Sequence, residues 1–198
     1  MPKWFALLML RILNMEVVDE NEGNWPKKYV LPTAPHTSNR DFPYGLYSRP
    51  VVDQWINFVG KSTLFKWPVG PVLKWMGGVP VVRERSTNFV DSVVRIFEER
   101  GEFRLCIAVE GTRSKVTHFK TGFYFIALKA KVPLIFCIFD FGKRKIIFTK
   151  PYHLTGNIRQ DFDFIYRQFD GVQGLVPENS FEYDPAVLDL LPEIRSEA

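Results

Sequence analysis

Short apolar runs of strand character alternate along this chain with stretches of helical periodicity, and this alternation restricts the possible folds more than any other feature. The expected strands cover 27–33, 54–60, 79–84, 104–109 and 132–141, and the expected helices cover 66–78, 88–100, 122–130 and 158–169. Strands joined by helices in this way pack as one sheet with helices on its faces. We therefore predict an α/β fold with a mixed, mainly parallel central sheet, in which Gly142 and Lys143 turn the chain into an antiparallel hairpin.

The N-terminal segment is apolar but short. Its uninterrupted apolar run extends from Trp4 to Leu10 and ends at Arg11. A membrane-spanning helix needs about 20 apolar residues, and a secretory signal needs a small-residue cleavage site, so neither is predicted. Residues 1–18 are expected to form an amphipathic helix with an apolar side made of Trp4, Phe5, Leu7, Leu8, Ile12 and Met15. On pattern alone two interpretations stay open, an interfacial membrane anchor or a helix packed on the domain's own core.

The length of 198 residues suits one domain. After the helix of 1–18 we expect the main domain over 27–175 and an acidic extension over 176–198 that lies at the surface or frays. The net charge of +4 is compatible with phosphate-bearing partners, but it does not distinguish nucleic acids from anionic lipids. Cys106 and Cys137 lie inside apolar runs and are expected to be buried free thiols, which is typical of a reducing compartment. No cysteine–histidine cluster has metal-ligand spacing, so no metal site is predicted.

Two common catalytic motifs are excluded. Gly60-Lys61-Ser62-Thr63 resembles the end of a phosphate-binding P-loop, but position 55, where that loop needs its first glycine, holds Trp55. No GxSxG sequence is present, so a serine hydrolase with the usual strand-to-helix nucleophile has no candidate.

The strongest local signal is the stretch from His36 to Asp41, which follows the first strand of the main domain. An imidazole titrates near pH ~6.5, which makes histidine the natural general base at neutral pH. Asp41 would hold one ring nitrogen and leave the other free to accept a proton from substrate. The alternative is a loop histidine beside an unrelated capping aspartate.

Two further polar blocks follow expected strands. Glu110-Gly111-Thr112-Arg113 stands at the end of a strand, where ligands of α/β proteins bind, and Arg113 is suited to hold a phosphate. The block from Gly77 ends in Arg83, another candidate anion ligand. Taken singly, a strand-end salt bridge or a solvated basic edge explains each block equally well. Together with His36 they describe a site that deprotonates a hydroxyl on a phosphate-bearing molecule.

The order and spacing of these blocks resemble the glycerolipid acyltransferase family, in particular its compact bacterial branch of 1-acyl-sn-glycerol-3-phosphate acyltransferases. The blocks that match are the HX4D motif of His36 and Asp41, the second block of 77–83, the complete EGTRS block of 110–114 and the Val132-Pro133 pair. The match covers about 30–140 in the family's order, and that joint pattern is far more specific than any one motif.

The resemblance implies a role for each matching residue. His36 would act as the general base and Asp41 would orient it. The acceptor phosphate would be bound by Arg83, Glu110, Gly111, Thr112 and Arg113, and the acyl donor by Val132 and Pro133. The implied co-substrates are an acyl-CoA or acyl carrier protein and a lysophospholipid at a membrane surface. No metal, redox cofactor or nucleic acid is implied.

The resemblance also favours the membrane-anchor interpretation of the N-terminal helix, because acceptor and product both reside in the bilayer. It predicts a protein at the cytoplasmic face of the membrane. Three other functions stay open, namely acylation of another lipid acceptor such as a lyso-aminolipid or a lipid-linked sugar, a thioesterase that uses water as the acceptor, and a non-catalytic lipid-binding module.

Overall fold

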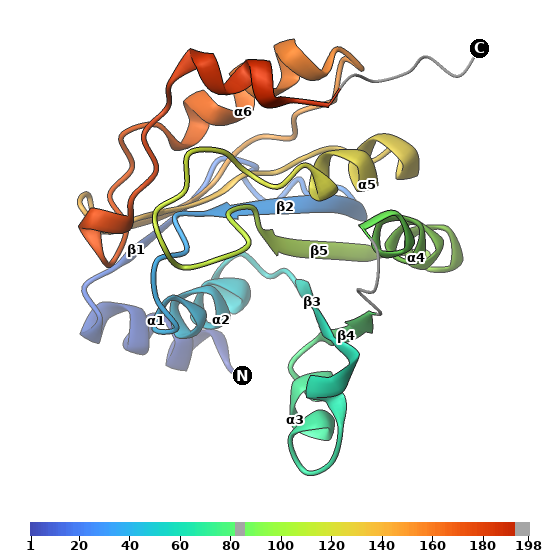
Figure 1. Ribbon diagram of the computed structural model, residues 1–198. Helices are drawn as coiled ribbons and strands as arrows, with labels where there is room; N and C mark the ends of the chain where they lie inside the picture. Colours follow the sequence, from blue (N-terminus) through green and yellow to red (C-terminus); the bar gives the residue numbers. More distant parts are fainter. Residues whose placement is uncertain (82–85, 193–198) are drawn as a thin grey trace.

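The computed structural model describes residues 1–81 and 86–192, and these form one sheet of seven strands in the order β1-β7-β6-β2-β5-β3-β4 (Figure 1). All neighbouring strands run parallel except β6 and β7, which form the antiparallel hairpin. The predicted mixed, mainly parallel sheet is therefore confirmed. The strands are β1 Glu16–Asp19, β2 Lys28–Ala34, β3 Asn57–Lys61, β4 Gly78–Val81, β5 Phe103–Ala108, β6 Cys137–Asp140 and β7 Lys145–Phe148.

Helices cover both faces of the sheet. α1 and α2 lie on one side of it, and α4, α5 and α6 lie on the other side and along its edge (Figure 1). The helices are α1 Lys3–Ile12, α2 Asp41–Val51, α3 Val69–Trp75, α4 Ser86–Glu99, α5 Gly122–Ala130 and α6 Ile158–Phe169, with 3-10 turns at Ser62–Phe65, Pro177–Asn179 and Pro185–Leu190.

Strand β2 is buried on both faces, as a central parallel strand should be. Tyr29 and Leu31 enter the apolar core beneath α1 and α2, while Val30 enters the core beneath α4, α5 and α6. The alternation follows from the two-residue period of a strand. This double burial fixes β2 firmly, and the chain that leaves its carboxyl end carries His36.

The N-terminal helix is shorter than the predicted 1–18. It ends at Ile12, where Asn14 adopts a left-handed backbone conformation (φ 53°), and Glu16–Asp19 forms strand β1 against β7. Valines at 17 and 18 suit this edge strand better than a helix. Met15, expected on the apolar side of this helix, lies beyond its end and is buried. Among the described residues, no helix is long and apolar enough to cross a bilayer.

The predicted strand over 132–141 is also interrupted. Only Cys137–Asp140 forms regular strand β6, and Leu134 makes isolated bridges to Val30 and Tyr152. Pro133 has no backbone N–H to donate to a ladder, which explains the break. Strand β4 ends at Val81, and the remainder of the predicted strand 79–84 lies outside the described residues.

The acidic C-terminal segment packs on the domain in its described part, so it is not frayed there, although many of its residues are exposed at the surface. Phe181 is fully buried, and Val187 and Leu188 are buried with it. The rings of Phe181 and Tyr183 both stack on Tyr166 of α6, with centroids 5.4 and 5.2 Å away. Acidic residues stand between these apolar positions, so the acidic composition of the segment gave no sign that it packs on the domain.

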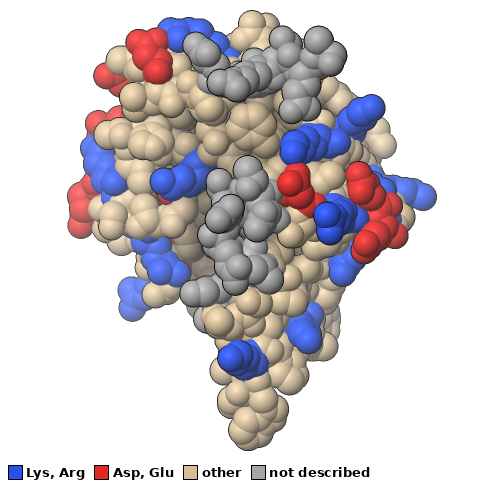
Figure 2. Space-filling model, turned by 45° about the vertical axis from the view of Figure 1, so that its right-hand side comes forward, with Lys and Arg blue, Asp and Glu red and all other residues tan. Residues whose placement is uncertain are grey.

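The connection between β3 and β4 stands away from the rest of the molecule. We call residues 62–76, which hold the turn Ser62–Phe65 and helix α3, the projection. Figure 1 shows it below the sheet, and Figure 2 shows that it forms the narrow lower end of the molecule.

Candidate active site

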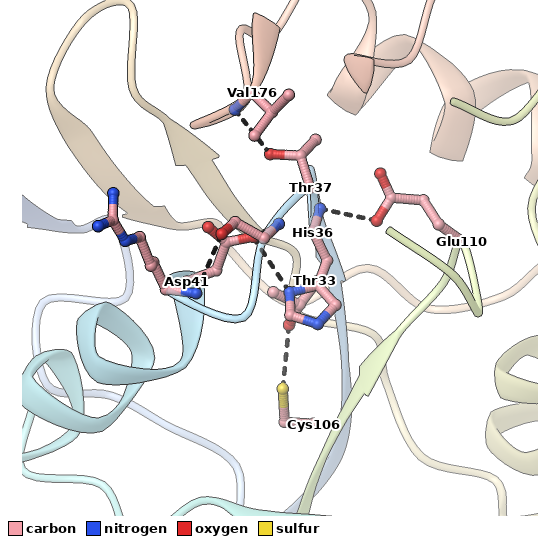
Figure 3. Close-up of polar contacts among 9 residues, drawn as sticks. Thr33, His36, Thr37, Asp41, Cys106, Glu110 and Val176 are labelled. Carbon is pink, nitrogen blue, oxygen red and sulfur yellow. Dashed lines mark hydrogen bonds and ion pairs between the residues drawn. The ribbon is translucent and has the colours of Figure 1, made fainter. Parts of the chain in front are cut away.

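The parallel pairing of β2 and β5 brings two of the predicted blocks together. Thr33 near the end of β2 is in register with Ala108 at the end of β5, so the chain leaves both strands at the same edge of the sheet. His36 lies two residues beyond β2, and Glu110 two residues beyond β5. Figure 3 shows Asp41 and Glu110 on opposite sides of His36.

His36 and Asp41 form the predicted pair. Nδ1 of His36 lies 3.2 Å from Oδ2 of Asp41, whose side chain is completely buried at the start of α2. The backbone N–H of Ser38 donates to the same oxygen at 2.9 Å, which fixes the carboxylate. An ionised carboxylate can only accept, so Nδ1 carries the proton in this pair and Nε2 is left as the basic nitrogen. The imidazole remains 23% exposed and is therefore accessible to a ligand.

Glu110 contacts the general-base candidate through the backbone. Its Oε2 accepts a hydrogen bond of 2.7 Å from the backbone N–H of His36, although the two residues are 74 positions apart in the sequence. Only 2% of Glu110 is exposed. Burial raises the pKa of this carboxyl group to about 7, even though the bond from His36 acts in the opposite direction. The resemblance implied a place for Glu110 in the phosphate wall, whereas its contact here holds the loop that carries His36.

A second long-range bond holds the same loop. Oγ1 of Thr37 accepts from the backbone N–H of Val176 at 3.0 Å. Gly174 packs so closely on this threonine that an added Cβ would lie 2.6 Å from its Cγ2. Neither contact could be predicted from the sequence, because residues so far apart along the chain form no motif.

The pair opens onto a cavity of about 390 Å³ between α2 and strands β2, β3 and β5. His36, Thr112 and Arg113 line it together, so the predicted base and part of the predicted phosphate wall meet at one site. Most other lining residues are apolar. They include Leu31, Leu46, Ile56, Phe58, Val59, Ile107 and Phe139. A largely apolar cavity with a few polar groups is the usual form of a site for an amphipathic ligand.

The three loop residues after Glu110 differ in character. Gly111 has a positive φ of 70°, and a Cβ there would lie 3.1 Å from Cγ of Lys120, so glycine suits this turn. Thr112 and Arg113 are exposed and follow it. The Arg113 guanidinium is thus accessible to an anion at the cavity.

The cavity is also lined by Arg49, which the sequence did not single out, and by both cysteines. Arg49 of α2 donates from Nη1 to the carbonyl oxygens of Ile56 and Met76, at 2.6 and 2.9 Å, and burial lowers its pKa. It thereby ties α2 to β3 and to the end of the projection. Cys106, predicted to be buried, is partly exposed and lies in the cavity wall, with its Sγ 3.1 Å from Oγ1 of Thr33. Cys137 is buried, as predicted.

The two residues predicted to bind the acyl donor are not brought to the cavity. Val132 and Pro133 are buried and do not line it. Val132 belongs to the core beneath α4, α5 and α6, whereas the cavity lies on the α2 side of the sheet. Arg83 lies outside the described residues. Within 1–81 and 86–192, no group of three or more His, Cys, Asp or Glu side chains is placed to hold a metal ion.

The raised pKa of Glu110 makes a prediction about stability. Because the pKa is about 7 in the folded protein and ordinarily 4.5, the protonated form is favoured on folding. This contribution is fully present below about pH 4.5 and is lost as the pH rises to about 7. Glu110→Gln, which keeps a neutral acceptor, should therefore match wild type at about pH 4.5 and exceed its free energy of unfolding by roughly 3 kcal/mol at about pH 8.

Urea denaturation at several pH values measures this difference. The matched control is Glu102→Gln, because the Glu102 side chain is half exposed and pairs with Arg104 at the surface. We expect its curve to follow wild type throughout. Parallel curves for Glu110→Gln and wild type would contradict the assignment.

The model of the Acyltransferase family matches residues 16–139. A comparison with curated protein sequences finds no significant match. Among solved structures, the crystal structure of the 1-acyl-sn-glycerophosphate (LPA) acyltransferase PlsC from Thermotoga maritima is similar, with a TM-score of 0.57 and 20% identity. The similarity covers 86% of this chain and 76% of that chain, and at this identity it concerns the fold.

Proposed function

Since this chain belongs to the Acyltransferase family and is an acyltransferase, we propose that it transfers a fatty acyl group from a thioester to the hydroxyl of a lysophospholipid. The thioester is an acyl-CoA or an acyl carrier protein. The favoured acceptor is 1-acylglycerol-3-phosphate, which would become phosphatidic acid. The observation that carries the proposal is the His36–Asp41 pair at a largely apolar cavity that Arg113 also lines.

The proposed reaction needs one base and no bound cofactor. Nε2 of His36 accepts the proton of the acceptor hydroxyl while the oxygen attacks the thioester carbonyl carbon. The C–O bond forms, the C–S bond breaks, and the proton passes from the imidazole to the departing thiolate. Asp41 keeps Nδ1 protonated and stabilises the imidazolium that forms between these steps. The products are an ester and a free thiol.

The lining of the cavity suggests where the acyl chain and the acceptor phosphate bind. The apolar wall of the cavity suits the acyl chain, because burying methylene groups there removes apolar area from water. We therefore assign the acyl chain to this wall rather than to Val132 and Pro133, which are buried and do not line the cavity. Arg113 is assigned to the acceptor phosphate by charge-assisted hydrogen bonds.

Helix α1 provides the proposed membrane anchor. Its buried side is Ala6 and Leu10, whereas the side chains on its outer face are exposed. Those exposed apolar residues are Trp4, Leu7, Leu8 and Ile12. An apolar helix face with Lys3 and Arg11 beside it suits the interface of a bilayer, where the lysophospholipid resides. The proposed location is the cytoplasmic face of the membrane.

Release of free thiol from palmitoyl-CoA by the purified protein tests this function. We expect release that depends on added lysophosphatidic acid, together with formation of phosphatidic acid. A parallel reaction with palmitoyl carrier protein identifies the donor. Release without any acceptor would identify a thioesterase, and release with monoacylglycerol as effective as with lysophosphatidic acid would overturn the phosphate-bearing acceptor.

Arg113→Ala tests the phosphate contact separately. We expect the KM for lysophosphatidic acid to rise about tenfold or more, with a smaller change in kcat, because a charge-assisted contact to substrate is lost. The matched control is Arg159→Ala, since Arg159 is an exposed arginine on α6. An unchanged KM for Arg113→Ala would remove this residue from the phosphate site.

A further inference from the structure

The projection exposes large apolar side chains that the rest of the domain does not cover. Trp67 is 86% exposed and Trp75 is 76% exposed, and Val69 and Val72 are more than half exposed. Tryptophan has the largest apolar surface of any side chain, and exposure of this degree is uncommon. Two such residues and two valines on one short element give it an apolar patch at the surface, and such a patch typically marks a binding surface.

The backbone of the projection is closely packed on its inner side. An added Cβ at Gly70 would lie 2.0 Å from the carbonyl oxygen of Phe65, so the helix crosses directly over the preceding turn. The backbone N–H of Gly70 donates to Lys66 at 2.8 Å. At Gly78, where the chain returns to the sheet, an added Cβ would lie 2.8 Å from the ring of Phe65 and 3.0 Å from that of Phe58. The patch is therefore presented by a packed element.

The charges of the projection favour an anionic membrane as its partner. Residues 62–76 contain Lys66 and Lys74, both exposed, and no aspartate or glutamate. Figure 2 shows this end of the molecule as mainly uncharged, with blue and no red on the visible face. Tryptophan and lysine together suit the interface of a bilayer, where the indole ring lies at headgroup level and the ammonium group meets anionic phosphate.

The projection also lies where contact with a membrane would bring the cavity next to the lipid. Figure 1 shows α1, α2 and the projection on the same side of the sheet. The cavity is walled by α2, which packs on α1, and by β3, which leads into the projection. The exposed apolar side of α1 and the patch of the projection therefore flank the cavity.

We propose that the projection is a second membrane-contacting element, which docks Trp67 and Trp75 into the interface of an anionic bilayer and, with α1, holds the cavity against the lipid. The proposal rests on the proposed function, because that function is the reason why a lipid should enter this cavity. Contact with a bilayer can nevertheless be measured without any turnover.

The experiment compares the full-length Trp67→Ala/Trp75→Ala variant with wild type in sedimentation with phosphatidylglycerol–phosphatidylcholine vesicles. We expect about a tenfold or greater loss of vesicle affinity, because two interfacial aromatic anchors are removed. The matched control is Phe164→Ala/Leu190→Ala, which removes two exposed apolar side chains away from α1 and the projection. This control should bind vesicles as wild type does, and circular dichroism should show that both variants fold.

A second variant tests the charge. Lys66→Glu/Lys74→Glu should lose affinity for vesicles with phosphatidylglycerol and change little with pure phosphatidylcholine. Unchanged vesicle binding by both projection variants would overturn the proposal. Sedimentation velocity gives a second outcome that would overturn it. If the projection variants lose self-association but keep vesicle binding, the patch is a contact between copies of the chain. Vesicle binding needs no substrate. It therefore tests this proposal even if the acyltransferase assay fails.

Discussion

Replacement of His36 by alanine should lower kcat by about a thousandfold or more in the acceptor-dependent thiol-release assay. A positioned general base contributes about 10²–10⁴ to the rate, and no other described histidine lines the cavity to replace it. Folding should be preserved, because the His36 side chain is partly exposed and the contacts of its backbone with Glu110 remain. The KM for either substrate should change far less than kcat.

His153→Ala is the matched control for this prediction. His153 is exposed beyond β7 and is not part of the cavity, so its variant should retain wild-type kcat. Asp41→Asn should also lower kcat, because the amide can donate to Nδ1 and favour the wrong tautomer. Activity of His36→Ala within tenfold of wild type would contradict the assignment of the base.

Asp161→Ala should produce the largest loss of stability, about 4 kcal/mol in the free energy of unfolding. Asp161 is fully buried in the first turn of α6. Its carboxylate accepts from the hydroxyls of Tyr124 and Tyr152 at 2.9 and 2.8 Å. It also accepts from Thr155 and from the backbone N–H of Gly156. Each buried donor left without an acceptor costs about 1–3 kcal/mol, and the negative charge also favours a helix N-terminus.

Urea denaturation measures this loss against two other variants. Asp161→Asn retains one acceptor oxygen and should fall between Asp161→Ala and wild type. Asp189→Ala removes a carboxylate whose pair with Arg159 is exposed, so its effect should stay below about 1 kcal/mol. Equal losses for Asp161→Ala and Asp189→Ala would show that the buried network contributes little.

Much of the fold could be predicted from the sequence because its signals are local. Apolar runs and helical periodicity gave the parallel strands and the helices of the main domain within a few residues. The errors come instead from contacts with other parts of the fold. Val17 and Val18 form an edge strand only because β7 lies beside them, and Phe181 is buried only because α6 offers a matching face.

The sequence by itself determined the pair of His36 and Asp41, because a short turn between a strand and a helix brings residues at this spacing into contact. Only the tertiary structure decided that Glu110 holds the backbone of His36 and that Val176 holds Thr37. These contacts depend on the register of β2 against β5 and on the path of the chain after α6. Exposure of Trp67 and Trp75 was likewise decided by the fold, because burial depends on which elements cover a residue and not on the residue alone.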